Sequence, residues 1–228
     1  MYRLILTALS LLLLAVPARA ASFAQVMKDA DPQAKYLFYL HGAIVEQQGK
    51  NATSPRYGVY LYDRIIEHFE DRGLVVIDEV RGKTNPNKYS STITQQVRRL
   101  LAAGVPPINI TVAGFSKGGY IALLVASSLQ VSEVGYVIMA GCGRGKFGQS
   151  FDRFLKKKRG ARLKGRILSI YATSDLDAGS CRPAIEQSSG KGLQFRETRV
   201  KTVKGHGLFY QPRPEWINPV AIFAKGGR

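Results

Sequence analysis

One stretch constrains the fold of this chain more than any other, residues 108–120, which read INITVAGFSKGGY. Its first half is a β-branched apolar run, and such a run predicts a buried strand. Its second half sets glycines on both sides of Ser116. Residues 120–126 are apolar enough to continue as a buried helix. The sequence therefore predicts a strand and a helix joined by a very short turn, with a serine at the turn.

The turn has the pattern Gly-x-Ser-x-Gly, which in a strand–turn–helix setting is typical of a nucleophile elbow. So tight a turn strains the backbone of Ser116 and exposes its hydroxyl at the carboxyl edge of the sheet. Side chains at Gly114 and Gly118 would collide with the neighbouring strand and helix. The N–H of Lys117 begins the helix, where the helix dipole favours negative charge. The alternative is a glycine-rich turn that only joins a strand to a helix.

Residues 1–20 differ in kind from the rest of the chain. A short positive start precedes an apolar run over residues 4–16, and residues 18–20 read Ala-Arg-Ala. This order predicts a secretory signal peptide cleaved near Ala20, with an uncleaved membrane anchor as the alternative. We therefore expect an exported protein, periplasmic or secreted, in which residues 21–228 form a single domain.

The composition suits one α/β domain with a strongly basic surface. The chain has 228 residues, of which 45% are hydrophobic, and its net charge of +17 falls to +15 once Arg3 and Arg19 are removed with the signal peptide. Such a field attracts polyanions, anionic lipid surfaces or acidic substrates. Interleaved basic and aromatic residues typical of nucleic-acid binding are missing, so no specific nucleic-acid partner is expected. Two cysteines without Cys-x-x-Cys spacing do not predict a metal site.

Segments of strand and helix character alternate along the chain, which predicts parallel β-α-β units and a sheet covered on both faces. Besides the strand before Ser116, the expected strands are residues 36–40, 74–77, 136–140, 166–171 and 195–203. Expected helices begin near Tyr57, at Thr92 as a cap, after Ser116 and at Pro214, and residues 81–91 are expected to form a loop. In such sheets the functional residues lie in the loops at the carboxyl ends of the strands.

With these positions placed, the chain resembles the α/β-hydrolase superfamily. The residues that carry the resemblance each follow a strand: His41 with Gly42, the turn from Gly114 to Gly118, Asp175, and His206. The order Ser…Asp…His is the one expected of that family. The resemblance covers nearly all of residues 36–224. It implies a three-layer α/β sandwich with a mostly parallel sheet of about six strands, and catalysis that requires no cofactor or metal.

The resemblance also implies a role for each residue. His206 would take the proton of Ser116, which is a poor nucleophile without a base, and would later protonate the leaving group. Asp175 would hold the imidazole in one tautomer and stabilise its charged form. The backbone N–H groups of Lys117 and Ala43 would bind the oxyanion.

Other residues compete for these roles. Asp177 is the alternative acid, although Asp175 falls at the strand end and is favoured for that reason. His41 precedes the elbow, so we expect it to shape the oxyanion loop by hydrogen bonds rather than to act as the base. His68 lies in an amphipathic segment and is expected at the surface. For His206 a purely structural role is the alternative.

The chain is shorter than a typical member of the α/β-hydrolase superfamily, and in its compact sheet it is similar to cutinase-like enzymes. Residues 141–165, where lids are often inserted, leave no room for a large lid. An open, shallow site of this kind suits soluble or polymeric esters better than a buried lipid tail.

Cys142 and Cys181 fall in loops after the fourth and fifth strands, which are expected to be neighbours. A disulfide between them would brace Asp175, and two separate buried thiols are the alternative. By restricting the unfolded chain, a bond across 39 residues should contribute about 3–4 kcal/mol.

A basic amphipathic helix is expected over residues 150–164, beside the mouth of the site. Its apolar face is marked by Phe147, Phe151, Phe154 and Leu155, and its basic residues are Arg153, Lys156, Lys157, Lys158 and Arg159. This pattern is consistent with a core face backed by a solvated face. It is also consistent with a surface that recruits anionic substrates or membrane headgroups.

Together these features predict an exported serine hydrolase, carboxylesterase-like, that cleaves a small-molecule or polymeric acyl ester through an acyl-enzyme. Two alternatives remain: an acyltransferase that uses the same three residues, and a non-catalytic binding protein with the hydrolase fold.

Overall fold

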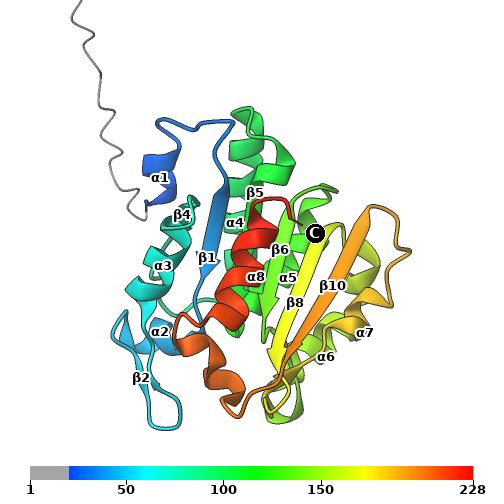
Figure 1. The fold of residues 1–228 in the computed structure, drawn as a ribbon. Coiled ribbons are helices and arrows are strands. Elements are labelled where there is room, and N and C mark those ends of the chain that lie inside the picture. Colours follow the sequence, from blue (N-terminus) through cyan, green and yellow to red (C-terminus); the bar gives the residue numbers. More distant parts are fainter. Residues whose placement is uncertain (1–20, 228) are drawn as a thin grey trace, which may run out of the picture.

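A computed structural model describes residues 21–227, and its centre is a six-stranded parallel sheet (Figure 1). The strands are β1 (Tyr36–Leu40), β4 (Val75–Asp78), β5 (Ile110–Phe115), β6 (Gly135–Met139), β8 (Gly165–Ala172) and β10 (Leu193–Val200). Their spatial order is β10-β8-β6-β5-β1-β4, and every neighbouring pair is parallel. The six predicted strands are therefore confirmed, while the predicted signal peptide lies outside the described residues.

Helices cover both faces of the sheet, as the alternation of elements predicts (Figure 1). One face packs against α3 (Tyr62–Glu70) and α8 (Pro214–Ala224). The other packs against α4 (Pro86–Ala102), α5 (Lys117–Leu129), α6 (Gln149–Lys156) and α7 (Arg182–Ile185). Strands β1, β5 and β6 are buried along their whole length, because a parallel sheet with two covered faces leaves neither side of a central strand in water.

Helix α4 begins at Pro86, seven residues earlier than a helix capped at Thr92 would begin. The predicted cap at Thr92 is therefore wrong, and so is the predicted loop over residues 86–91. The side chain of Asn85 caps this helix by accepting the N–H of Asn87 at 2.9 Å. Pro86 follows at the first helical position, where its missing N–H is not needed. The pair Asn85-Pro86 is itself a helix-start signal, and the polar composition of residues 81–91 obscured it.

Two further segments differ from the prediction. Residues 53–59 form a small antiparallel hairpin of β2 (Thr53–Ser54) and β3 (Gly58–Val59), so α3 begins at Tyr62 rather than near Tyr57. The polar lead-in before β1 contains a short helix, α1 (Phe23–Val26), held by a capping box between Ser22 and Gln25.

The predicted basic helix over residues 150–164 is also shorter than expected. Helix α6 ends at Lys156, and Lys158 adopts a left-handed conformation with φ 49° that a helix cannot continue through. A 3₁₀ turn, η3 (Arg159–Arg162), follows. Gly160 packs there against the backbone of Ala184 so closely that a side chain would collide. Over the described residues, no helix has the length and apolar character that crossing a bilayer requires.

The predicted disulfide between Cys142 and Cys181 is present. The bond joins the loops that follow the neighbouring strands β6 and β8. The same two loops also pair through two short antiparallel strands, β7 (Cys142–Gly143) and β9 (Ala178–Gly179). Because β9 directly follows the turn that carries Asp175, the bond restrains the chain beside that carboxylate.

Replacing both cysteines with serine should lower the free energy of unfolding by about 3–4 kcal/mol, since the unfolded chain regains the entropy of a long loop. Urea denaturation of both proteins measures this difference. A reductant should lower the free energy of unfolding of the wild type to about that of the double variant, and should leave the double variant unchanged. Equal stability of the two oxidised proteins would contradict the prediction.

Candidate active site

Ser116 occupies the sharp turn between β5 and α5, with φ 54° and ψ −116°. This conformation is strained for a residue with a side chain, and it holds the serine at the carboxyl edge of the sheet. A side chain on Gly118 would collide with the backbone of Leu40 in β1, and one on Gly114 would collide with the backbone of Gly118. Glycine at both positions lets the helix start against the strand.

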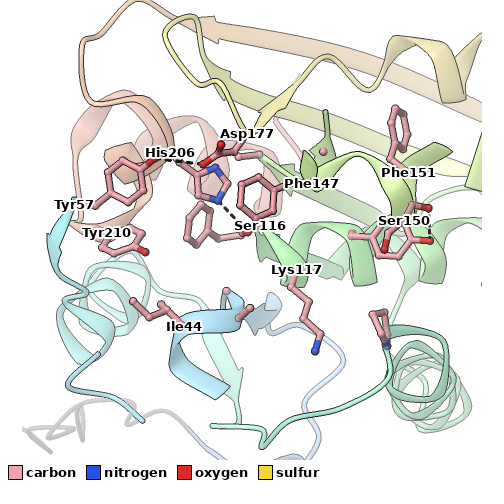
Figure 2. A pocket seen from close by; sticks show the side chains of 18 residues that line it. Ile44, Tyr57, Ser116, Lys117, Phe147, Ser150, Phe151, Asp177, His206 and Tyr210 are labelled. Carbon is pink, nitrogen blue, oxygen red and sulfur yellow. Dashed lines mark hydrogen bonds between the residues drawn. The ribbon is translucent and has the colours of Figure 1, made fainter. Parts of the chain in front are cut away.

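The structure brings Ser116, His206 and Asp175 into one hydrogen-bonded chain, of which Figure 2 shows the contact between Ser116 and His206. His206 Nε2 lies 2.9 Å from Ser116 Oγ, and His206 Nδ1 lies 2.8 Å from Asp175 Oδ2. His206 comes from η4 (Gly205–Tyr210), after β10, and Asp175 comes from the turn after β8. With its Nδ1–H donated to the carboxylate, the imidazole presents Nε2 as an acceptor for the serine proton.

The carboxylate of Asp175 is buried and well supplied with donors. Its Oδ1 accepts the backbone N–H groups of Asp177 at 2.8 Å and Ala178 at 3.2 Å. Burial alone would raise the pKa of Asp175. The hydrogen bond from His206, its charge and the two N–H groups outweigh burial, so the pKa lies below its ordinary value. Asp175 therefore stays ionised.

Asp177 takes a different place. Its carboxylate accepts the Tyr57 hydroxyl at 3.4 Å and lines the cavity in front of His206. Of the two carboxylates considered from the sequence, Asp175 is the one that contacts the histidine. Arg144, which the sequence reading did not single out, supports this turn: its N–H donates to the Asp177 carbonyl at 3.0 Å and its guanidinium donates to the Asp175 carbonyl.

Ala43 and Lys117 are the first residues of α2 (Ala43–Gln48) and α5, respectively. The N–H groups in the first turn of a helix have no partner within that helix, so both point outward from a positive helix end. Gly42 caps α2 with an extended backbone. The structure thus places the two expected oxyanion donors at helix starts that follow the adjacent strands β1 and β5.

His41 is fully buried behind the Gly42 loop. Its Nδ1–H donates to the Gly42 carbonyl at 2.9 Å, and its Nε2 accepts the Arg81 N–H at 3.0 Å. Burial, followed by the charge of Arg81, lowers the pKa of His41 from 6.5 to about 3. His41 is therefore a neutral hydrogen-bonding residue of this loop. His68 lies half-buried on α3 beside Arg72.

Acid should destabilise the protein through His41. Between pH 6.5 and 3 the unfolded chain binds a proton at this position that the folded protein does not. The free energy of unfolding should thus fall with decreasing pH, by up to about 1.4 kcal/mol per pH unit from this residue. Urea denaturation across this range should show a shallower slope for His41→Gln than for the wild type. Equal slopes would contradict the prediction.

Ser116 and His206 line a cavity of about 560 Å³ (Figure 2). Six aromatic side chains contribute to its walls, those of Tyr57, Phe115, Tyr120, Phe147, Phe151 and Tyr210. Tyr57 and Tyr210 lie on one side of His206, and Phe147 and Phe151 lie on the other (Figure 2). The sequence did not predict these residues as walls of a cavity, because they come from β5, from helices and from separate loops and share no periodic pattern.

One group of residues within 21–227 has the composition of a metal site, namely Asp175, Asp177 and His206, whose ligand atoms lie within 4.8 Å of one another. Both ring nitrogens of His206 are already engaged, by Asp175 and by Ser116. The arrangement is better suited to proton transfer between the serine and the histidine than to holding a cation.

No known protein family and no curated protein matches the sequence, whereas several solved structures resemble the fold. SOBER1 of Arabidopsis thaliana has a TM-score of 0.55 at 12% identity, covering 84% of this chain and 98% of that one. A monoacylglycerol lipase of Paleococcus ferrophilus has a TM-score of 0.54 at 15% identity, covering 83% and 93%. A truncated carbohydrate esterase from gut microbiota has a TM-score of 0.56 at 12% identity, covering 86% and 87%. The chain has the α/β-hydrolase fold.

Proposed function

We propose that this protein is a serine hydrolase that cleaves an ester or related acyl bond through an acyl-enzyme. The observation that carries the proposal is the chain from Ser116 through His206 to Asp175, with contacts of 2.9 and 2.8 Å at the wall of an open cavity. Three fold neighbours are described as an esterase or a lipase, which supports hydrolase chemistry on this fold.

In the proposed reaction, His206 Nε2 takes the proton of Ser116 as Oγ attacks the acyl carbon. The carbonyl oxygen becomes an oxyanion, and the N–H groups of Lys117 and Ala43 stabilise it. His206 then gives its proton to the departing alcohol, and the acyl group stays on Ser116. Water then attacks the acyl carbon while His206 takes its proton, and His206 returns that proton to Ser116 as the carboxylic acid leaves. Asp175 stays ionised throughout and stabilises the imidazolium.

The proposal is tested by labelling with a fluorophosphonate, which reacts with a serine only where a base activates it. We expect wild-type protein to form one covalent adduct and to hydrolyse short activated esters. An adduct without ester hydrolysis, together with product formed from an added alcohol, would favour the acyltransferase alternative. No adduct and no turnover would favour the binding-protein alternative.

We infer that the substrate is a soluble or polymeric ester. The cavity is open at the carboxyl edge, and its aromatic walls suit an apolar or ring-containing group beside the acyl carbon. We also infer export after cleavage near Ala20, which the disulfide supports because such bonds persist in oxidising compartments.

We further propose that α6 and η3 attract an anionic surface or substrate. The exposed cations there are Arg153, Lys156, Lys157, Lys158 and Arg162. Within residues 21–227, none of these five forms an ion pair, and Asp152 is the one acidic residue of the segment 149–162. Phe147, which is 55% exposed, lines the cavity and lies two residues before the start of α6.

If this is correct, kcat/KM for an ester that carries negative charge should fall as salt rises, while that for a neutral ester should not. Changing Lys156, Lys157 and Lys158 to Glu should reproduce the loss at low salt. The matched control changes Lys28, Lys191 and Lys225 to Glu, an equal charge change on exposed residues at the amino end of the sheet. Equal losses in the two triple variants would show that only the net charge of the protein matters, and the proposal for α6 and η3 would then be wrong.

A further inference from the structure

Glu46 has a buried carboxylate that binds two cations at once. Its side chain is 3% exposed. Oε1 accepts Arg81 Nε at 2.7 Å, and Oε2 accepts Lys117 Nζ at 2.5 Å. The Lys117 ammonium also donates to the Thr84 carbonyl at 2.7 Å. Both carboxylate oxygens are thus fixed, and the lysine side chain is held rather than free in the cavity.

The pair of Glu46 and Lys117 joins the two segments that carry the oxyanion donors. Glu46 lies one turn into α2, whose first residue is Ala43, and Lys117 is the first residue of α5. The two partners are 71 positions apart in the chain. The ion pair therefore ties the start of one helix to the start of the other, and these two starts carry the N–H groups assigned to the oxyanion.

Arg81 extends the same connection to the loop between β1 and α2. Its side chain is 2% exposed. The Arg81 guanidinium donates to the His41 carbonyl, and its backbone N–H donates to His41 Nε2 at 3.0 Å. One carboxylate, that of Glu46, thus links three segments that follow the adjacent strands β4, β1 and β5.

Stability alone is a poor reason for this arrangement. Burying charges requires desolvation, and a buried pair is often no more stabilising than apolar residues of the same size. Position is a better reason, because an oxyanion hole works only while both donors stay about 2.7–3.1 Å from the developing oxyanion. An ion pair that spans the two donor segments limits how far they can move apart.

We propose that Glu46 is a positioning residue that sets the separation of the Ala43 and Lys117 N–H groups through its bond to the Lys117 side chain. The inference rests on the proposed function. Glu46 touches no substrate, so its loss acts on the geometry of the oxyanion hole. Binding of the ground state depends little on that geometry, whereas stabilisation of the transition state depends on it strongly.

The experiment compares Glu46→Gln, Lys117→Met and the double variant on an activated ester. Lys117→Met retains the backbone N–H and the Glu46–Arg81 pair. Each single variant should lower kcat by about 10–100-fold, less than complete loss of a donor, with KM within about twofold. Affinity for a boronic acid, which mimics the oxyanion, should fall by the same factor as kcat/KM. The double variant should lose no more than the worse single variant.

The matched control is Asp63→Asn, which removes the carboxylate that α3 contributes to the exposed Lys50–Asp63 pair. It should leave kcat, KM and boronic acid affinity unchanged. The proposal is wrong if a folded Glu46→Gln protein keeps its kcat, or loses kcat while boronic acid affinity stays the same. Additive losses in the double variant would also overturn it, because the two residues would then act independently.

Hydrogen exchange separates this inference from the proposed function. In Glu46→Gln, amides in residues 42–48 and 116–120 should exchange faster together, and Asp63→Asn should change neither segment. If the wild type forms no fluorophosphonate adduct, the proposed function fails, and joint loss of protection still shows that Glu46 couples the two segments. Unchanged exchange in both segments rejects the coupling, whatever the activity.

Discussion

Replacing Ser116 with alanine is expected to abolish both fluorophosphonate labelling and ester hydrolysis. Without the hydroxyl no acyl-enzyme forms, and kcat should fall on the order of 10⁴–10⁶-fold. A residual rate above that in water should remain, since the oxyanion donors of Ala43 and Lys117 are backbone groups that the substitution leaves in place. Intact-protein mass spectrometry measures the adduct, and hydrolysis of an activated ester measures the rate.

Ser128→Ala is the matched control. Ser128 lies on the same helix α5, and its hydroxyl donates to the Leu124 carbonyl at 2.9 Å, away from the cavity. This variant should label and turn over like the wild type. Equal labelling of Ser116→Ala and wild type would show that another residue is the nucleophile, and the catalytic proposal would then be wrong.

The second large effect is expected at Asp175. In Asp175→Asn the amide carbonyl is still needed by the N–H groups of Asp177 and Ala178, so the amide NH2 faces His206 and donates to Nδ1. The imidazole then loses the tautomer in which Nε2 accepts the serine proton. We expect kcat to fall by about 10⁴-fold with little change in KM. The pH dependence of kcat should change as well, since the carboxylate no longer stabilises the imidazolium.

Asp177→Asn serves as the comparison, because it removes an equal charge two residues away. Asp177 contacts Tyr57 rather than His206, so this variant should lose far less activity than Asp175→Asn. A larger loss in Asp177→Asn would transfer the role of the acid to that residue. Circular dichroism of both variants checks that each is folded before the rates are compared.

The sequence predicted the architecture well, because the signals for it are local. A central parallel strand is buried on both faces and must be apolar throughout, as β5 and β6 are. The turn at Ser116 requires glycine where a side chain would meet the backbone of β1 or α5. The start of α4 also has a local signal, the cap Asn85 followed by Pro86, but the polar residues around it resemble those of a loop.

The candidate site was predictable in its order but not in its contacts. Strand ends share one edge of the sheet, so Ser116, Asp175 and His206 could be expected near one another. Which of Asp175 and Asp177 faces the histidine depends on the path of one turn, in which Oδ1 of Asp175 accepts two N–H groups. The aromatic side chains of the cavity come from β5, from helices and from loops far apart in the sequence, so only the tertiary structure brings them together.

By itself, then, the sequence determined the strand–helix alternation, the strained serine turn and the cysteines available for pairing. The tertiary structure decided the cluster of Glu46, Arg81 and Lys117, which no motif marks. These residues follow β1, β4 and β5, and they meet because the sheet places those strands side by side in the order β5-β1-β4. Local sterics act between near neighbours in the chain, whereas contacts between distant segments exist only once the sheet order brings them together.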